Sequence, residues 1–301
     1  MSLTFKQVRY FIAAAETGQI SHAAMEMNIS QSAVTAAIQQ LETQLGVMLL
    51  ERTPSGVRPT IEGARFLNHA RNIAAAVEDA VRSPLGEGRT VSGSLRVAAT
   101  YTVSGYFMSR HYTRFRRAYP DIDIEMVELQ RGDIEKGIID GWVDMAVMLV
   151  SNLENQAEID HETLFRSRRR LWLPADHRLL SADHVTLKEV AAEPYVMLTV
   201  DEARVTANRY WQKANLSPNV IFATSSVEAV RSLVAAGMGV TILSDMVYRP
   251  WSLESQRIEL RTLDQEIPSM DVGLAWARSR PQSQAAGIFR AFMSVALGGG
   301  G

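Results

Sequence analysis

The chain has 301 residues, of which 47% are hydrophobic and 21% charged, and its formal net charge is −2. This composition is typical of a globular protein with about two domains, and it excludes wholesale disorder. Because the sequence contains no cysteine, it also excludes disulfides, thiolate zinc sites, iron–sulfur clusters and a cysteine nucleophile.

We expect no secretory signal at the N-terminus. Residues 1–6 lead directly into a helical pattern, without the basic stretch, apolar segment and cleavage site of a secretory signal. Charged residues interrupt even the most apolar stretch, 227–242, so no membrane span is predicted. We therefore expect a cytoplasmic protein, with the glycines at 298–301 as a disordered tail.

Residues 21–45 predict two short helices joined by a tight turn. Ser21 is a candidate N-cap of the first helix, and Asn28 can end it because asparagine tolerates the left-handed conformation. Ser30 is the candidate N-cap of the second helix, which Gly46 ends. The apolar stripe of this helix consists of Val34, Ile38, Leu41 and Leu45. This order predicts a helix-turn-helix.

The second of these helices has a polar but uncharged face. Gln31, Thr35 and Gln39 recur at intervals of four residues, and Ser32 lies beside them. Glutamine can make two hydrogen bonds to an adenine edge, and a serine or threonine hydroxyl can donate or accept, while the threonine methyl can contact thymine. The face therefore suits the major groove of DNA. A solvated helix surface is the alternative.

A turn flanked by two arginines follows at residues 53–56. Thr53-Pro54-Ser55-Gly56 would hold Arg52 and Arg58 at the tip of a hairpin-like wing, where they could bind phosphates or enter a minor groove. With these two arginines included, residues 1–65 carry balanced charge, five basic and five acidic side chains. We therefore expect affinity to depend on a dimer that binds two half-sites.

A long helix is predicted next, up to the breaker-rich linker at 83–88. Its apolar seam recurs at spacings of three and four and consists of Leu67, Ala70, Ala74, Val77 and Val81. The small seam residues favour a second helix lying close by, most simply that of another subunit. A helix packed on its own domain is the alternative.

From residue 91 onward strands and helices alternate, which predicts an α/β domain with a mostly parallel sheet. The strand candidates are 94–97, 122–126, 144–150, 171–174, 195–199, 220–223, 240–243 and 272–276. A helix is predicted at 132–141, and others lie between the later strands. One sheet and two small lobes are both compatible with this pattern.

These segments together resemble the LysR-type transcriptional regulators over nearly the whole chain. The matching motifs include Ser21-His22-Ala23-Ala24, Asn28-Ile29-Ser30-Gln31-Ser32-Ala33-Val34-Thr35, Leu49-Leu50-Glu51-Arg52 and Gly93-Ser94-Leu95-Arg96-Val97. The resemblance implies a winged helix-turn-helix at 1–63, a dimerisation helix and hinge at 64–90, and a two-lobed α/β effector domain of periplasmic-binding-protein type at 91–297. Lobe I would comprise about 91–165 and 270–297, and lobe II about 166–269.

The resemblance also implies partners and roles for single residues. Gln31, Ser32 and Thr35 occupy base-reading positions, and Arg52 a backbone-contacting position. The expected DNA-binding set is completed by Ser21, Gln39 and Arg58. The expected partners are double-stranded DNA with paired half-sites, a small-molecule effector, further copies of the chain as a dimer or tetramer, and, for such a regulator, RNA polymerase. No cofactor and no metal is expected.

Ligands of open α/β sheets collect at the carboxyl ends of strands, beside helix N-termini. The segment 100–104 is the first such end, and the resemblance makes it one wall of an effector cleft. The expected effector-binding residues are Thr100, Tyr101, Thr102, Met148, Thr199 and Thr224. The hydroxyls and the helix dipole suit a small carboxylate or another anion, whereas Met148 and Tyr101 would equally suit an apolar pocket. The identity of the effector stays open.

Four nearby arginines could form an anion clamp, namely Arg166, Arg168, Arg169 and Arg170. On a strand they would alternate between faces, so at most half could enter one cleft. A solvated or intersubunit role is the preferred interpretation.

Two other classes of function fit the sequence less well. An enzyme is disfavoured because His161-Glu162-Thr163-Leu164-Phe165 begins like a zinc-protease helix but has Phe165 where the second histidine is required. Nucleophile-elbow and phosphate-loop motifs are also missing from the sequence. A free-standing solute-binding protein of periplasmic type would account for the lobes but not for the N-terminal helices. We therefore expect a regulator and not an enzyme.

Overall fold

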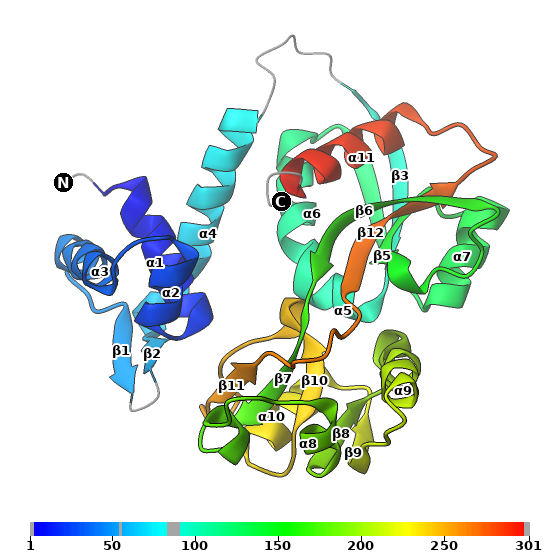
Figure 1. The fold of residues 1–301 in the computed structure, drawn as a ribbon. Helices are drawn as coiled ribbons and strands as arrows, with labels where there is room; N and C mark the ends of the chain where they lie inside the picture. Colours follow the sequence, from blue (N-terminus) through cyan, green and yellow to red (C-terminus); the bar gives the residue numbers. More distant parts are fainter. Residues whose placement is uncertain (1–2, 54–55, 83–90, 298–301) are drawn as a thin grey trace. The chain divides into compact units, whose positions relative to one another are not determined.

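A computed structural model describes residues 3–53, 56–82 and 91–297. They form two compact units, which precede and follow the segment 83–90 along the chain (Figure 1). We call them the N-terminal unit and the C-terminal unit. The predicted linker at 83–88, the tip of the wing turn at 54–55 and the tail at 298–301 lie outside the described residues.

The N-terminal unit has a compact group of helices, a β-hairpin and a long final helix. Its elements are α1 (Phe5–Thr17), α2 (Ile20–Glu26), α3 (Gln31–Leu45), β1 (Leu50–Thr53), β2 (Gly56–Pro59) and α4 (Ile61–Arg82). The two strands pair antiparallel, with Leu50 opposite Pro59. The order of helices and hairpin is that of a winged helix-turn-helix, as predicted.

The ends of α3 are confirmed, while the start of α2 is not. The Ser30 hydroxyl accepts a hydrogen bond from the Ala33 N–H, and Gly46 takes the left-handed conformation with φ of 71°. Asn28 is left-handed as well, with φ of 53°. Gln19 precedes the first turn of α2 as its N-cap residue, so the prediction that Ser21 caps this helix is wrong.

The core of the N-terminal unit lies between α1, α2 and α3. Val34, Ile38 and Leu41 are buried there, but Leu45 in the last turn of α3 is 39% exposed. The next apolar side chains to enter this core are instead Leu49 and Leu50, at the start of the wing. The buried stripe of α3 therefore ends one turn earlier than predicted.

Part of the predicted dimer seam of α4 packs inside its own domain. Ala70 is fully buried in the core of the N-terminal unit, and Leu67 packs against that core. The seam prediction is corrected for Ala70, because its side chain has no surface left for a second helix. Ala74 is half-buried, Val77 is 36% exposed, and the side chain of Val81 lies outside the described part of the structure.

The first half of the C-terminal unit is a five-stranded sheet with helices on both faces, which we call lobe I. The strand order is β4-β3-β5-β12-β6. The elements are β3 (Gly93–Ala99), α5 (Tyr101–Val103), a π-helical turn (Ser104–Met108), α6 (Ser109–Ala118), β4 (Ile122–Glu128), α7 (Arg131–Asp140), β5 (Met145–Leu149), β6 (Ile159–Ser167), β12 (Met270–Ala277) and α11 (Gln284–Leu297).

The chain between β6 and β12 forms lobe II. An antiparallel sheet of order β10-β7-β11 is joined through a bridge between Val240 and Tyr195 to the parallel pair β8-β9. The elements are β7 (Arg169–Pro174), α8 (Leu187–Ala191), β8 (Pro194–Leu198), α9 (Ala203–Lys213), β9 (Asn219–Thr224), α10 (Val227–Ala235), β10 (Thr241–Ser244) and β11 (Ile258–Arg261).

The prediction of a mostly parallel sheet is wrong. In lobe I β3 is parallel to β4 and β5, but β12 is antiparallel to both β5 and β6, and in lobe II β7 is antiparallel to both its neighbours. The cause is that β12 returns to lobe I from lobe II and so enters the sheet from the opposite end.

Within the described ranges, no helix is both long and apolar enough to cross a bilayer.

Candidate DNA-binding surface and interlobe site

The predicted base-reading side chains lie on the accessible surface of α3. Gln31, Ser32 and Gln39 are exposed, and Thr35 is half-buried. The Thr35 hydroxyl donates to the carbonyl of Gln31 at 2.9 Å, one turn back along the helix. Its lone pairs and its methyl group therefore remain for a ligand, so Thr35 is suited to accept a hydrogen bond and to make an apolar contact.

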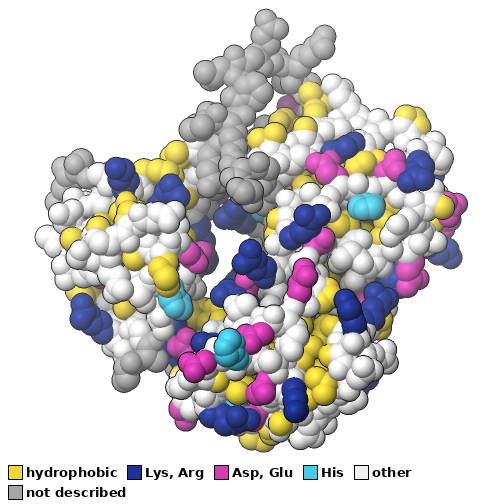
Figure 2. Space-filling model, viewed as in Figure 1, with side chains coloured by type: hydrophobic (Ala, Val, Ile, Leu, Met, Phe, Trp, Pro, Cys, Tyr) yellow, Lys and Arg dark blue, Asp and Glu magenta, His cyan; other side chains and the backbone are white. Residues whose placement is uncertain are grey.

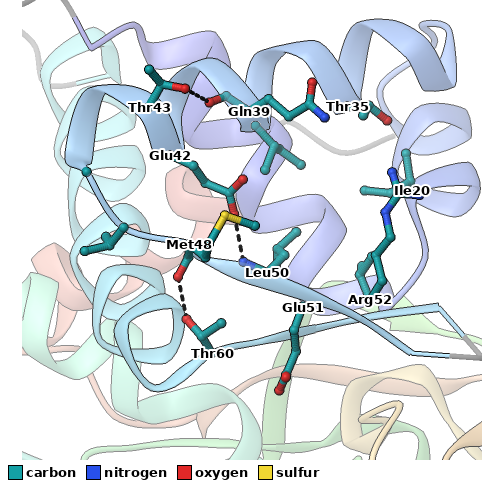
Figure 3. A pocket seen from close by; sticks show the side chains of 14 residues that line it. Ile20, Thr35, Gln39, Glu42, Thr43, Met48, Leu50, Glu51, Arg52 and Thr60 are labelled. Carbon is teal, nitrogen blue, oxygen red and sulfur yellow. Dashed lines mark hydrogen bonds between the residues drawn. The ribbon is translucent and has the colours of Figure 1, made fainter.

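A groove of about 910 Å³ runs between α3 and the wing (Figure 3). It brings together Thr35 and Gln39 from α3 with Arg52 from β1, three residues of the predicted DNA-binding set. Ile20 and Met48 add apolar surface to its walls. Ser21, Gln31, Ser32 and Arg58 are not among its lining residues. The groove thus joins one edge of the predicted reading face to the base of the wing.

Glu42 connects α3 to the wing. Glu42 is 8% exposed, and its Oε1 accepts hydrogen bonds from the main-chain N–H groups of Leu49 at 2.7 Å and Leu50 at 3.0 Å, the second of which is drawn in Figure 3. A charged acceptor satisfies both donors at the start of β1, so Glu42 helps to fix the position of the wing relative to α3, together with the packing of Leu49 and Leu50 in the core. Glu42 was not anticipated from the sequence.

The wing is packed closely against the start of α4. A Cβ atom on Gly63 would lie 1.9 Å from the carbonyl oxygen of Leu49, which only glycine avoids. Thr60 adds a hydrogen bond from its hydroxyl to the carbonyl of Met48 at 2.7 Å. The hairpin is therefore held from α3 on one side and from α4 on the other.

The two wing arginines differ in their partners. Arg58 pairs with Glu51 across the hairpin at 2.6 Å, and the two residues are directly opposite in the register. Arg52 is exposed and forms no ion pair within the part of the chain that the structure describes. Of the two wing arginines, Arg52 is therefore the one whose charge is available to bind a phosphate. On the face drawn in Figure 2, the N-terminal unit is mostly covered by uncharged side chains and backbone.

The predicted effector-binding segment lies at the carboxyl end of β3, where α5 begins. Thr100 precedes α5 and is 1% exposed, and its hydroxyl makes no hydrogen bond within the described residues. Thr102 is 3% exposed, whereas Tyr101 is 39% exposed. Buried hydroxyls at this place suit a polar ligand better than an apolar one.

Lobe II contributes a carboxylate to this same place. The Oδ2 of Asp201 accepts a hydrogen bond from the Thr102 N–H at 2.7 Å and another from the Thr102 hydroxyl. Asp201 lies in the short turn Val200–Glu202, which follows Thr199 after the end of β8. The structure thus brings Thr102 and the segment after Thr199 together, and neither Asp201 nor its neighbour Glu202 was anticipated from the sequence.

An ionic network lies beside this contact. Arg131 at the start of α7 pairs with Glu135 at 3.0 Å, Glu154 at 2.9 Å and Glu202 at 3.3 Å. Burial acts to raise the pKa of Glu135, but hydrogen bonds from the N–H groups of Glu154 and Asn155 and from Arg131 hold that pKa below its ordinary value. Burial raises the pKa of Glu202, against the lowering effect of Arg131.

The other predicted effector residues are Thr199, Thr224 and Met148. Thr199 and Thr224 are half-buried neighbours, because the Thr199 N–H donates to the Thr224 carbonyl at 2.9 Å. Met148 is fully buried and packs against Ile134 and Ile138 of α7. The prediction that Met148 lines the effector site is therefore corrected: its side chain points to the helix that covers the sheet.

The arginine run lies where the chain crosses from β6 to β7. Arg166 pairs with Asp271 at 3.3 Å and Arg170 with Asp245 at 2.6 Å, while Arg169 donates to the carbonyls of Pro268 and Ser269. Burial lowers the pKa of Arg169 from its ordinary value. Three of the four arginines are thus engaged within the C-terminal unit, and Arg168 is exposed.

The segment that begins like a zinc-protease motif is not a helix. Residues 161–165 lie on β6, where neighbouring side chains point to opposite faces of the sheet. Glu162 is engaged by Arg290 at 3.0 Å and by the Ser294 hydroxyl at 2.7 Å, both from α11. This carboxylate therefore has a structural role between β6 and α11.

Two family descriptions match the chain. Residues 5–64 match "Bacterial regulatory helix-turn-helix protein, lysR family", and residues 88–297 match "LysR substrate binding domain". The first match spans α1 to the start of α4, and the second spans both lobes.

Relatives match this chain over most of their length. The uncharacterized HTH-type transcriptional regulator YnfL of Escherichia coli K12 is 30% identical over 99% of this chain and 100% of its own length. The HTH-type transcriptional regulator AlsR of Bacillus subtilis is 29% identical over 87% of this chain and 86% of its own. The crystal structure of HinK, a LysR family transcriptional regulator from Pseudomonas aeruginosa, superposes with a TM-score of 0.64 at 24% identity, covering 98% of this chain and 99% of HinK. That likeness shows the fold.

Proposed function

Because the chain belongs to the LysR family of bacterial helix-turn-helix regulators, we propose that it binds specific DNA sites through α3 and the wing and responds to an effector bound between its lobes. The polar, accessible face of α3 beside the groove to Arg52 is the observation that carries the proposal. We assign residues 1–63 to DNA binding, 64–90 to the connecting helix and hinge, and 91–297 to effector binding. Gln31, Ser32 and Thr35 read bases and Arg52 contacts the backbone, while Ser21, Gln39 and Arg58 complete the DNA-binding set.

We propose a small carboxylate or a similar anion as the effector. The support is chemical, since the site at the start of α5 offers the main-chain N–H and the hydroxyl of Thr102 together with the buried hydroxyl of Thr100. These are hydrogen-bond donors at a helix start, where negative charge is favoured. Thr199 and Thr224 form the opposite wall in this proposal, and Tyr101 covers the entrance.

Arg52→Ala is expected to weaken binding to all DNA sequences alike and to flatten the plot of log K against log salt by about one unit. The reason is that one unpaired charge near a phosphate would be lost. Fluorescence anisotropy over a salt series measures this slope. Arg58→Ala is the matched control, and we expect a smaller change because Glu51 already neutralises Arg58. A loss restricted to one base sequence would contradict the phosphate role.

We further propose a homodimer through the exposed end of α4. Ile73 and Val77 are 37% and 36% exposed and lie one turn apart. Val77→Asp is expected to convert the dimer to monomers in light scattering coupled to gel filtration, because a buried unpaired charge opposes association. Leu253→Asp, at a side chain 76% exposed in lobe II, is the control and should leave the mass unchanged. An intact Val77→Asp dimer would place the subunit contact elsewhere.

A further inference from the structure

One side chain of lobe II, that of Asp201, contacts Thr102 of lobe I. One carboxylate oxygen of Asp201 accepts two hydrogen bonds from Thr102. The main-chain oxygen of Asp201 accepts a third hydrogen bond, from the side-chain amide of Asn152 at 3.3 Å. Asn152 follows β5, so two segments of lobe I hold one residue of lobe II.

The backbone that presents Asp201 is in an unfavourable conformation. Asp201 has φ of 51° and Glu202 has φ of 59°, and both are left-handed without being glycine. Two successive residues of this kind are rare, because the Cβ atom approaches the following carbonyl oxygen. Such a conformation persists only when surrounding contacts hold it. Here the contacts are those to Thr102 and Asn152, together with the ion pair between Glu202 and Arg131 at 3.3 Å.

The same carboxylate satisfies donors that an anionic ligand would use. It accepts from the main-chain N–H and the hydroxyl at the start of α5, the two donors that support a carboxylate effector. The neighbouring Thr100 hydroxyl, buried and without a hydrogen bond among the described residues, would be left for a second oxygen. Asp201 and a carboxylate ligand therefore cannot both occupy this place.

We propose that Asp201 is a tethered internal ligand, which closes the lobes by occupying the anion position at Thr102 until an effector carboxylate displaces it. The inference rests on the proposed function of this site. Displacement frees Asp201 and Glu202 to leave the left-handed conformation, and this couples ligand exchange to a change in the lobe arrangement. A separate hydrogen bond, from the Tyr106 hydroxyl to Glu228 at 3.0 Å, still joins the lobes. Loss of the Asp201 contact should therefore widen the range of lobe positions without separating the lobes.

The first test measures lobe positions in the full chain without DNA or effector. Since the sequence has no cysteine, spin labels at Lys136→Cys on α7 and Asn208→Cys on α9 report one distance across the lobes. The labelled chain is mixed with an excess of unlabelled chain, so that an oligomer rarely contains two labelled subunits and the measured distances lie within one subunit. In the labelled chain Asp201→Gly is expected to shift the distribution to longer and broader distances. Glycine removes the carboxylate and tolerates the left-handed backbone.

The matched control is Asn215→Gly. Asn215 is also left-handed, with φ of 54°, and is exposed in lobe II, so this variant makes the same backbone change without touching the contact. It should retain the parent distribution. Asp201→Asn keeps the shape of the side chain and is expected to give an intermediate distribution, because a neutral acceptor is weaker. Distributions for Asp201→Gly and Asp201→Asn that match the parent would overturn the proposal.

The second test uses sodium acetate as the probe, with sodium chloride at equal ionic strength as reference. If Asp201 blocks the site in nine of ten molecules, its removal raises the apparent acetate affinity about tenfold. A ligand-observed NMR titration measures this gain, and adding Thr102→Val to Asp201→Gly should abolish it. Equal acetate affinity in the parent and in Asp201→Gly would contradict displacement. Neither test involves DNA, so a failure of DNA binding and a failure of the Asp201 contact remain distinguishable.

Discussion

Glu42→Ala is expected to lower the free energy of unfolding of the N-terminal unit by about 2–4 kcal/mol. The substitution removes a charged acceptor and leaves the N–H groups of Leu49 and Leu50 buried without a partner. Urea unfolding measures the change in stability. Hydrogen exchange in peptides over 47–53 locates it, and we expect faster exchange at the start of β1.

Two variants separate this effect from a general effect of charge. Glu42→Gln retains Oε1 and should lose about 1 kcal/mol, because it exchanges a charged for a neutral acceptor. Glu51→Ala removes an exposed carboxylate from the neighbouring hairpin and should change stability by less than about 1 kcal/mol. If Glu42→Ala cost no more than Glu51→Ala, Glu42 would not hold the wing to α3.

Gln31→Ala is expected to lower affinity for a cognate duplex by about 1–3 kcal/mol and to leave affinity for random DNA nearly unchanged. Gln31 is exposed at the first turn of α3, and its side chain makes no hydrogen bond among the described residues. Its amide is therefore available for a base edge. Fluorescence anisotropy with cognate and scrambled duplexes at one salt concentration provides both affinities.

Gln40→Ala is the matched control for Gln31→Ala. Gln40 is exposed on the same helix but lies about half a turn around it from Gln31. It accepts a weak hydrogen bond of 3.4 Å from Gln7 of α1. Its replacement should leave the ratio of cognate to random affinity intact. Equal losses on both duplexes for Gln31→Ala would show that Gln31 does not read a base.

Local signals in the sequence were sufficient for most elements of the fold. Ser30 and Gly46 mark the ends of α3 because a side-chain cap and a left-handed glycine act within a few residues. The prediction that Ser21 caps α2 failed because the helix begins earlier, after Gln19. Gln19 occupies the N-cap position without a side-chain hydrogen bond, so the sequence gives no sign of it. The antiparallel entry of β12 could not be read locally, since it depends on where the chain re-enters lobe I.

For the candidate sites too, some residues could be predicted from the sequence and others could not. The face of α3 follows from helical spacing, and the strand ends at Thr100 and Thr199 follow from the order of elements. The acceptor for Thr102 lies 99 residues away, and the buried carboxylate of Glu42 gave no signal that distinguished it from a surface glutamate. Ala70 shows the limit of periodicity, because one apolar stripe serves equally for the core of its own domain and for a second helix.

Selection of binding sites from random duplexes by the full chain is the most direct test of base reading by α3. We expect an enriched motif of two half-sites separated by about one helical turn of DNA or a multiple of it. In a parallel selection, Gln31→Ala should lose its preference at one base pair in each half-site and keep the remainder of the motif. Recovery of an identical motif with Gln31→Ala, or no enriched motif with the unaltered chain, would contradict the account.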